Sequence, residues 1–484
     1  MTAGELLAHV EAAGLEQVRI AWADLHGSYR SKTLVVGGPF GTRALASALK
    51  QGVGMVSTLL LKDSADRSAL QVFEPGALAG LAGFGAANNL LLWPDPASFV
   101  ELPWAPRTGW LRATPRWSDG STVEACPRGV LQRALARLAE AGYTLRVGLE
   151  VEFHVYRLDA APLPAAVPGW PAEPAAVHAL HPGHGLLSEA WADRAHEVFA
   201  IVRHTAAGLG LPLASLEVEF GPSQVEAVFS ATDALTAADQ LIAFRNGVRQ
   251  ALARAGWHAT FMARPPLAGA MASGWHLHQS LLDLSTGRNA FVPAPSRAVA
   301  AGQGDARQLL SDLGAHYLAG LLEHAPGMTA LCTSTVNGFG RFSAHAMAPQ
   351  SVVWGRDNRG AMLRVIGGPG ESATRIENRL GEPAANPYLY LAAQIYAGLD
   401  GIARGALPAP ATESPYAQAA ERVQRIPGQL GQALAALAQD PVLCAGLGAQ
   451  FVEHYRVIKQ LEQDRFDAAS DKLEFSRREY FGRI

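Results

Sequence analysis

The chain has 484 residues, more than one hydrophobic core usually accommodates, so two or more domains are expected. Apolar residues make up 49% and charged residues 17%, which excludes a disordered chain. The net charge of −3 and the lack of a basic run exclude binding to nucleic acid or to an anionic membrane surface by electrostatics.

The cysteines indicate a reducing compartment. Cys126, Cys332 and Cys444 are far apart and form no CxxC pair, so a disulfide framework is not expected. The first 17 residues read as an amphipathic helix containing acids rather than as a signal peptide. No stretch approaches the roughly 18 apolar residues of a membrane span. A soluble, cytoplasmic protein is predicted.

The N-terminal part reads as a small mixed domain. After the first helix, residues 17–36 alternate like two strands around a turn at His26–Gly27. The stretch 95–107 is dense in proline and predicts a linker. We therefore expect one domain over 1–108 and a second over 109–484.

The larger domain begins with a helix over 127–142, which has proline in its first turn and glycine at its end. Residues 158–183, rich in proline and alanine, predict a surface insertion or flap. Strands are expected at 145–156, 215–229, 259–264, 275–282, 350–365 and 374–380, with helices at 189–208, 232–254 and 305–325 and again from 387 onwards. This order predicts an α+β fold with an antiparallel or mixed sheet whose functional residues converge on one face.

Six ionisable residues stand in otherwise apolar or glycine-rich stretches. Buried together they would be costly without positive charge, which two divalent cations would supply. Five carboxylates and one imidazole suit Mg²⁺ or Mn²⁺ better than zinc, which prefers cysteine or several histidines. The candidate metal ligands are Glu150, Glu152, Glu219, Glu226, His276 and Glu377.

Period-two spacing places several of these side chains on shared strand faces. Glu150 and Glu152 share one face of a strand, and so do His276 and His278. The alternative for the glutamates is an exposed strand edge with solvated acids, although the flanking residues are apolar. A Gly-Pro break between Glu219 and Glu226 would bend a strand and aim both carboxylates inward.

A dense set of arginines follows. Arginines beside a carboxylate suggest forks that bind substrate carboxylate and phosphate oxygens. The alternative is a network of surface salt bridges. The set comprises Arg341, Arg359, Arg364, Arg375 and Arg379.

These motifs, in this order, resemble the glutamine synthetase family, and specifically its glutamate–amine (γ-glutamyl-amide) ligase branch. The matching stretches are GLEVEF, EFGPSQVE, ATFMARPPLAGAMASGWHLHQSL, NGFGRF, APQSVVWGRDNRGAMLR and ATRIENRLGEPAANPYLYLAAQIYAGLDGI. The early stretch ADLHGSYRSK is similar to the family's small β-grasp domain. The resemblance implies an N-terminal β-grasp domain followed by a catalytic domain.

The resemblance also implies roles. Glu152, Glu219 and Glu226 match the ligands of the substrate-side metal, and Glu150, His276 and Glu377 those of the phosphate-side metal. Arg341 and Arg379 match the arginines that bind glutamate. Arg359 matches the arginine that stabilises the transferring phosphoryl group. His278, Ser280, Arg364 and Arg375 match positions that contact ATP.

The implied reaction joins the γ-carboxylate of glutamate to an amine through a γ-glutamyl phosphate, with two or three Mg²⁺ or Mn²⁺ ions per site. Family members form homo-oligomers, and the resemblance implies a dodecamer of two stacked hexameric rings. In such rings the small domain of one subunit completes the site of its neighbour.

The family pattern breaks at the amine pocket. Met347 stands where ammonia-using members have an acidic residue, and Val56 stands near the position of their small-domain aspartate. An apolar pocket favours a neutral or hydrophobic amine. We therefore expect an aromatic or small alkyl amine, with polyamines and ammonia as lower alternatives. His345 is more readily explained as a surface residue than as a proton acceptor.

Other departures concern the acid and the nucleotide. Met271 and Ala272 replace an Asn-Gly pair that contacts glutamate, Ser223 replaces a glycine, and Ser372 replaces a lysine found in some members. Two alternatives of other classes remain. One is a catalytically silent ring with a structural or regulatory role, and the other is an unrelated Mg²⁺-dependent phosphotransferase.

Overall fold

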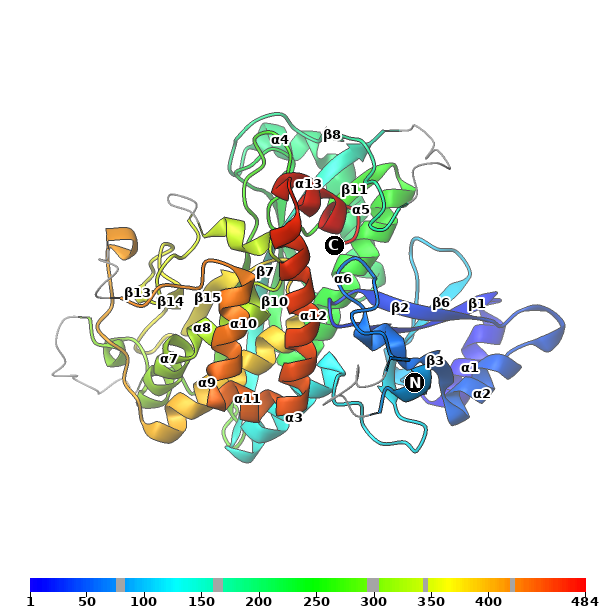
Figure 1. The fold of residues 1–484 in the computed structure, drawn as a ribbon, viewed down its shortest axis with the longest axis horizontal. Helices are drawn as coiled ribbons and strands as arrows, with labels where there is room; N and C mark the ends of the chain where they lie inside the picture. The colour runs from blue at the N-terminus through cyan, green and yellow to red at the C-terminus, as the bar shows by residue number, and fades with distance from the viewer. Residues whose placement is uncertain (75–82, 160–168, 294–303, 343–346, 418–422) are drawn as a thin grey trace.

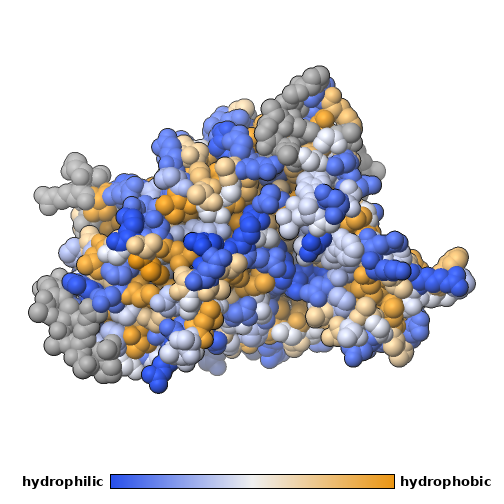
Figure 2. Space-filling view, turned by 90° about the horizontal axis from the view of Figure 1, so that it is seen from below, coloured by the Kyte–Doolittle hydropathy of each residue, from blue (hydrophilic) through white to orange (hydrophobic). Residues whose placement is uncertain are grey.

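The computed structural model describes residues 1–74, 83–159, 169–293, 304–342, 347–417 and 423–484. Two sheets organise this part of the chain. A small N-terminal sheet (blue in Figure 1) projects to one side of a larger body, whose own sheet is surrounded by helices. On the face that Figure 2 shows, polar and apolar residues are interspersed over both parts. The α+β prediction is confirmed.

The small sheet has six strands among the described residues, in the order β2-β1-β6-β4-β3, with β5 beside β6. The predicted first helix is α1, Ala3–Ala12, and a reciprocal pair of hydrogen bonds between Thr2 and Glu5 caps its start. The predicted strand pair is the antiparallel hairpin β1/β2. The bounds are β1 Gln17–Ala23, β2 Tyr29–Val35, α2 Arg43–Gln51, β3 Val53–Val56, β4 Asn89–Pro94, β5 Val100–Glu101 and β6 Thr108–Arg116.

The prediction of a linker over 95–107 is wrong. Pro96 starts the 3₁₀ turn Pro96–Ser98, and the short strand β5 pairs with β6, so this stretch belongs to the small sheet. Proline is tolerated in the first turn of a helix, and β5 is too short to offer an open edge. The predicted boundary at 108 lies at the first residue of β6. Because β6 pairs with β1 and β4, we propose a boundary after Arg116 instead.

The larger sheet has nine strands among the described residues, in the order β13-β14-β15-β12-β7-β10-β9, with β8 and β11 also paired to β7. Its longest strand, β7, is central and lies between β12 and β10. The bounds are β7 Tyr143–Leu158, β8 Val177–Ala179, β9 Leu213–Val218, β10 Gln224–Asp233, β11 Trp257–Thr260, β12 Trp275–Asp283, β13 Trp354–Arg356, β14 Leu363–Ile366 and β15 Arg375–Gly381.

Four predictions for stretches of the larger domain need correction. The strand expected at 259–264 is β11, which ends at Thr260. The run 215–229 is a hairpin of β9 and β10, because the Gly221-Pro222 break reverses the chain instead of bending one strand. The run 350–365 is divided into β13 and β14, which pair in parallel. The stretch 158–183 contains strand β8, while residues 160–168 lie outside the described part.

The helices surround the large sheet (Figure 1). Two helix predictions need adjustment: the helix expected at 189–208 is interrupted at Ala195, and the one expected at 305–325 begins at Asp312. The bounds are α3 Pro127–Glu140, α4 Glu189–Arg194, α5 His196–Gly208, α6 Ala234–Arg254, α7 Asp312–Glu323, α8 Ala325–Cys332, α9 Pro387–Arg404, α10 Leu430–Gln439, α11 Pro441–Leu447, α12 Ala449–Ala468 and α13 Lys472–Ser476.

No helix of the described residues is by itself long and apolar enough to cross a membrane. Helices α10 and α11 meet the length and composition test only as a pair, and the pair bends by 84° at its break.

His324 lies between helices α7 and α8, and its ring links them to α9 and α11. Its Nδ1 lies 2.7 Å from the Asp440 carboxylate at the start of α11, and its Nε2 lies 3.0 Å from the Asp400 carboxylate in α9. Burial alone would lower the pKa of His324, but the hydrogen bonds and charges of Asp440 and Asp400 raise it above its ordinary value. The protonated imidazole therefore stabilises the fold.

We expect His324→Gln to lower the free energy of unfolding by about 1–3 kcal/mol at pH 6 and by less at pH 9. The folded pKa is raised, so the stabilisation is complete below about pH 6.5 and is lost as the pH rises through the folded value. Thermal unfolding at both pH values measures the difference. The control is His316→Gln, since the His316 ring bonds a backbone carbonyl. An equal loss at both pH values would contradict the prediction.

Candidate active site

The register of the large sheet brings the predicted ligands onto one face. His276 on β12 lies opposite Glu150 on β7, and Glu226 on β10 lies opposite Glu152. Glu377 on β15 lies opposite His278. Because side chains alternate along strands, these pairs point to the same side. The alternative of an exposed edge for Glu150 and Glu152 is wrong, since β7 is a central strand.

Glu152, Glu219 and Glu226 form the first group. Each offers a carboxylate oxygen, and the three oxygens lie within 4.8 Å of one another. Glu219 follows β9 in the turn that joins it to β10, where its backbone N–H donates to the Gln224 carbonyl. These are the three residues predicted for the substrate-side metal.

Glu150, His276 and Glu377 lie beside this group. Nδ1 of His276 is 3.5 Å from the Glu150 carboxylate and 3.9 Å from that of Glu377. Two further clusters within 4.8 Å overlap the predicted sets: Glu150 with Glu226 and His276, and Glu150 with His278 and Glu377. Glu226 therefore lies within reach of both predicted ligand groups. His278, predicted only to contact ATP, lies among the possible ligands as well.

The charges in this cluster call for a cation. Burial, and then the nearby carboxylates led by Glu152, raise the pKa of Glu226 to about 9. Burial and Glu219 likewise raise the pKa of Glu152. Burial lowers the pKa of His276 to about 4, so its ring is a neutral donor near pH 7. An oxygen-rich, mutually repelling set with one neutral imidazole fits a hard divalent cation.

Backbone and amide groups fix Glu152. Its Oε2 accepts hydrogen bonds from the Gly274 N–H at 3.0 Å and from Gln224 Nε2 at 2.9 Å. A Cβ on Gly274 would lie 3.0 Å from both Arg341 Nη2 and His276 Nε2, so only glycine leaves this space open. Gln224 and Gly274 were not predicted as site residues, although both stand inside the quoted motifs.

Two predicted substrate-binding arginines lie near these carboxylates. Arg341 is buried and donates to the Leu380 and Arg379 carbonyl oxygens at 3.0 and 3.4 Å, and within the described chain it makes no ion pair. Arg379 pairs with Glu377 at 2.5 Å, and its Nε is buried without a partner in the described residues. Buried, incompletely partnered guanidinium groups fit a substrate carboxylate.

The other arginines divide into two kinds. Arg364 forms ion pairs with Glu377, at 2.9 Å, and with Asp357. Arg375 donates a hydrogen bond to His278 Nδ1 at 3.0 Å. Both arginines therefore point toward the cluster of possible ligands and do not belong to a network of surface salt bridges. Arg359 is exposed in the turn after β13. The hydrogen bond and charge of Arg364, and after them the charge of Arg359, lower the pKa of Asp357.

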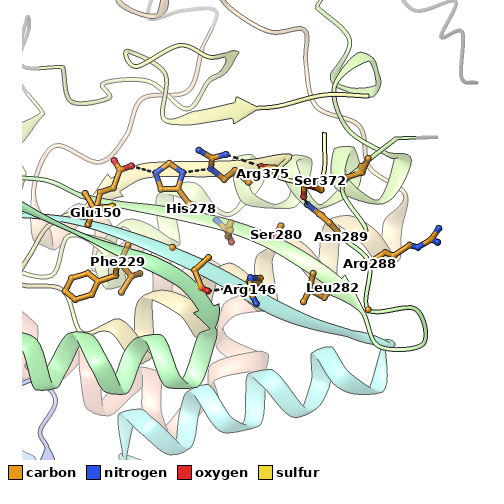
Figure 3. A pocket seen from close by; sticks show the side chains of 18 of the residues that line it. Arg146, Glu150, Phe229, His278, Ser280, Leu282, Arg288, Asn289, Ser372 and Arg375 are labelled. Atoms are coloured by element: carbon orange, nitrogen blue, oxygen red, sulfur yellow. Dashed lines mark hydrogen bonds and ion pairs between the residues drawn. The ribbon is translucent and has the colours of Figure 1, made fainter. Parts of the chain in front are cut away.

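A cavity of about 1090 Å³ opens beside the cluster. In Figure 3, Glu150, His278 and Arg375 form a hydrogen-bonded row along one wall, and Ser280, Asn289 and Ser372 continue it. Three of the four predicted ATP residues, His278, Ser280 and Arg375, line this cavity, while Arg364 lies beside the cluster. Arg146 and Asn289 also line it and were not predicted.

Met347 and Val56, predicted for the amine pocket, belong to different parts of the fold. Met347 is 55% exposed with φ of +49°, and its carbonyl oxygen lies 3.5 Å from Arg379 Nη2. Val56 is 39% exposed at the end of β3 in the small sheet. His345 lies outside the described residues.

The departures from the family pattern form contacts of their own. Ser223 has φ of +61°, and its hydroxyl accepts a hydrogen bond from the Leu180 N–H at 2.8 Å. The Met271 side chain packs where a Cβ on Gly221 would lie, and the Ala272 carbonyl accepts from Gln224. These contacts join the β9–β10 turn to two loops beside Glu152.

Known proteins are similar to this chain over most of its length. Residues 124–478 match the glutamine synthetase catalytic domain family. The chain is 35% identical to γ-glutamylanilide synthase of Acinetobacter sp. over 96% of its length and 90% of that protein. It is 33% identical to γ-glutamylethanolamide synthetase GlnA4 of Streptomyces coelicolor, over 98% and 94% respectively. A solved GmaS/ADP complex superposes with a TM-score of 0.76 at 29% identity, covering 97% of this chain and 98% of the other.

Proposed function

The chain belongs to the glutamine synthetase family, and on that premise we propose that it links the γ-carboxylate of glutamate to an aromatic or small alkyl amine. It is an ATP-dependent ligase of the γ-glutamyl-amide branch. The observation that carries the proposal is Glu150, which belongs to the carboxylate cluster and also lines the large cavity. A nucleotide in that cavity would therefore bring its phosphates to the cluster.

The chain's own residues have separate tasks in this proposal. His278, Ser280 and Arg375 bind ATP in the cavity, and Arg364 holds Glu377 near the phosphates. Arg341 and Arg379 bind the carboxylates of glutamate. Glu152, Glu219 and Glu226 would hold one divalent cation, and Glu150, His276 and Glu377 a second, with two or three Mg²⁺ or Mn²⁺ ions per site. Such cations, when bound, neutralise charge on phosphate oxygens.

The reaction has two displacement steps. A γ-carboxylate oxygen of glutamate attacks the γ-phosphorus of ATP, the bond to the bridging oxygen breaks, and ADP leaves. The amine nitrogen then attacks the carbonyl carbon of the γ-glutamyl phosphate. The carbon–oxygen bond to phosphate breaks, phosphate leaves, and the nitrogen releases a proton to solvent. Arg359 stabilises charge on the phosphoryl group during the first step.

Apolar residues at the amine positions support the choice of amine. Met347 and Val56 offer no negative charge to hold an ammonium group. An arylamine is mostly uncharged near neutral pH and has an apolar body, whereas a polyamine carries several charges. The relatives that act on aniline and ethanolamine are consistent with this choice. Polyamines and ammonia are the alternative substrates.

An amine panel tests the proposal. Ammonium, ethylamine, ethanolamine, aniline and putrescine are each supplied with ATP and glutamate, and phosphate release and product mass are measured. We expect the highest kcat/KM with aniline or a small alkyl amine. The highest kcat/KM with ammonium, and no product from the others, would contradict the choice of amine. If no amine in the panel leads to phosphate release, the alternative of a non-catalytic ring would be favoured.

We expect Met347→Glu to raise the ratio of kcat/KM for ammonium to that for aniline by about tenfold. A carboxylate at this position would attract the cationic amine and disfavour the apolar one, and a difference of about 1.4 kcal/mol gives that factor. Met347→Gln is the control, because it matches glutamate in size without the charge. The side chain is exposed, so neither change should affect folding. An equal shift in both variants would show that charge is not the cause.

Assembly and location are part of the proposal. A dodecamer of two hexameric rings would let the small sheet of one subunit, including Val56, approach a neighbour's site. Size-exclusion chromatography with light scattering measures the subunit number. The three free cysteines, Cys126, Cys332 and Cys444, support the cytoplasm as its location.

A further inference from the structure

A buried carboxylate outside the proposed ligand set lies close to the substrate arginines. Glu382 follows β15 and is fully buried. It accepts hydrogen bonds from the backbone N–H groups of Ser334 and Thr335 at 2.6 and 2.7 Å, and from their hydroxyl groups at 3.2 and 2.8 Å. Four donors on one carboxylate fix the start of the loop that follows α8.

That loop leads directly to Arg341. The Thr335 hydroxyl accepts a hydrogen bond from the Gly338 N–H at 3.0 Å, at the start of the 3₁₀ turn Gly338–Arg341. A Cβ on Gly338 would lie only 2.1 Å from Glu382 Oε2, so glycine is needed for this close approach. Glu382 thus determines where the turn that carries Arg341 begins.

The other end of the loop returns to the same strand. The Arg341 guanidinium donates to the Leu380 carbonyl oxygen, two residues before Glu382. The loop is therefore attached to residues 380–382 at both ends, through Glu382 at its start and Leu380 at its finish. A shift of the first attachment would tilt the guanidinium relative to Glu152.

The negative charge of Glu382 also offsets the positive charge of Arg341, although the two residues form no direct ion pair. Burial lowers the pKa of Arg341, and the charges of Glu152 and Glu382 oppose that effect. Among the described residues no carboxylate forms an ion pair with Arg341, whereas Glu377 pairs directly with Arg364 and Arg379. Arg341 thus keeps its charge while its donors remain available to a ligand.

We propose that Glu382 is a positioning residue, which holds Arg341 in the orientation that binds the carboxylate of the acid substrate. This inference rests on the proposed function of Arg341. A purely structural role for Glu382 would affect folding and all kinetic constants alike. A positioning role affects the KM for glutamate and leaves the KM for ATP unchanged.

The test measures steady-state kinetics and thermal unfolding of Glu382→Gln in the full-length protein. An amide of equal size replaces one accepting oxygen by an NH₂ group and removes the negative charge, so the attachment of the loop is weakened. Since a misplacement of about 1 Å can cost 10²-fold, we expect the KM for glutamate to rise about ten- to 100-fold. Glu382→Asp, which retains the charge, should lie between wild type and Glu382→Gln. Glu479→Gln, at a buried carboxylate paired with Arg465, should leave the KM for glutamate unchanged.

A milder pair of variants keeps the test decisive if Glu382→Gln does not fold. Thr335→Val removes one donor to Glu382 and the acceptor for Gly338, and should raise the KM for glutamate severalfold. Thr329→Val is the matched control, because among the described residues the buried Thr329 hydroxyl bonds only to the Ala325 carbonyl of its own helix, α8. Equal rises of the KM for glutamate and the KM for ATP, or no change in either, would overturn the inference.

A separate variant distinguishes the inference from its premise. Arg341→Gln should raise the KM for glutamate at least as much as Glu382→Gln. If Arg341→Gln leaves that KM unchanged, the proposed role of Arg341 fails. If Arg341→Gln raises it and both Glu382→Gln and Thr335→Val leave it unchanged, only the positioning role fails.

Discussion

Glu226→Gln is expected to lower kcat by about 10³-fold or more, the largest loss among single ligand changes. Its carboxylate belongs to two of the overlapping clusters, one with Glu152 and Glu219 and one with Glu150 and His276. Loss of this one oxygen donor would weaken both proposed cation sites. Cations on a transferring phosphoryl group contribute several kcal/mol, and about 4 kcal/mol corresponds to 10³ in rate.

The same variant should not be less stable in the absence of metal. Three carboxylates within 4.8 Å repel one another, and burial adds to the cost of their charge. A neutral amide of the same size relieves that repulsion. We therefore expect the metal-free variant to unfold at or above the temperature of the metal-free wild type, and its thermal shift with MgCl₂ or MnCl₂ to be much smaller.

Glu217→Gln is the control for this experiment. Glu217 lies opposite Glu226 in the β9–β10 register but belongs to none of the clusters of possible ligands among the described residues. It should retain activity and the metal-dependent thermal shift. A large metal-induced shift in Glu226→Gln, with activity near that of wild type, would refute the assignment of Glu226 as a ligand.

Local spacing predicted which ligand side chains share a strand face. The period-two motifs around Glu150 and His276 were correctly assigned to strands, because alternation along a strand is a local property. The pairing of those strands is set by contacts between distant segments, and the sequence alone does not specify the register. The sharing of Glu226 and the 2.9 Å contact of His278 with Glu150 therefore became visible only in the folded chain.

Turn chemistry explains the largest errors in the fold prediction. Gly221-Pro222 was interpreted as a bend, yet Ser223 follows it at positive φ and closes a hairpin. The prolines of 95–107 were interpreted as a linker, although proline also suits a 3₁₀ turn and the flank of a short edge strand. In both places composition indicated irregular structure and tertiary pairing determined its form.

Glu382 was not predicted because its role has no local signature. It differs from the proposed ligands only in what surrounds it, namely four donors from a loop 47 or 48 residues earlier in the chain. The same holds for Gln224, whose amide links Glu152 to residues 272 and 273. Residues that hold a site in place are recognised by their partners, whereas ligands are recognised by their own chemistry.

Arg359→Gln is expected to lower kcat by about 10²- to 10⁴-fold while changing the KM values for ATP and glutamate little. Three other arginines of the set already have side-chain partners near the cluster: Arg364 and Arg379 pair with Glu377, and Arg375 with His278. Arg359 is exposed and makes no hydrogen bond or ion pair within the described chain. Its charge is therefore available for a group that appears only during the reaction.

An interaction made only in the transition state lowers kcat without lowering substrate affinity when it is lost. Arg356→Gln is the matched control, because Arg356 is exposed on the adjoining strand β13 and has the same charge. Single-turnover measurement of γ-glutamyl phosphate formation separates this step from the amine step. A rise in the KM for ATP with unchanged kcat would make Arg359 a nucleotide-binding residue. Equal losses of kcat in Arg359→Gln and Arg356→Gln would show that only the positive charge of this segment matters, and not the position of Arg359.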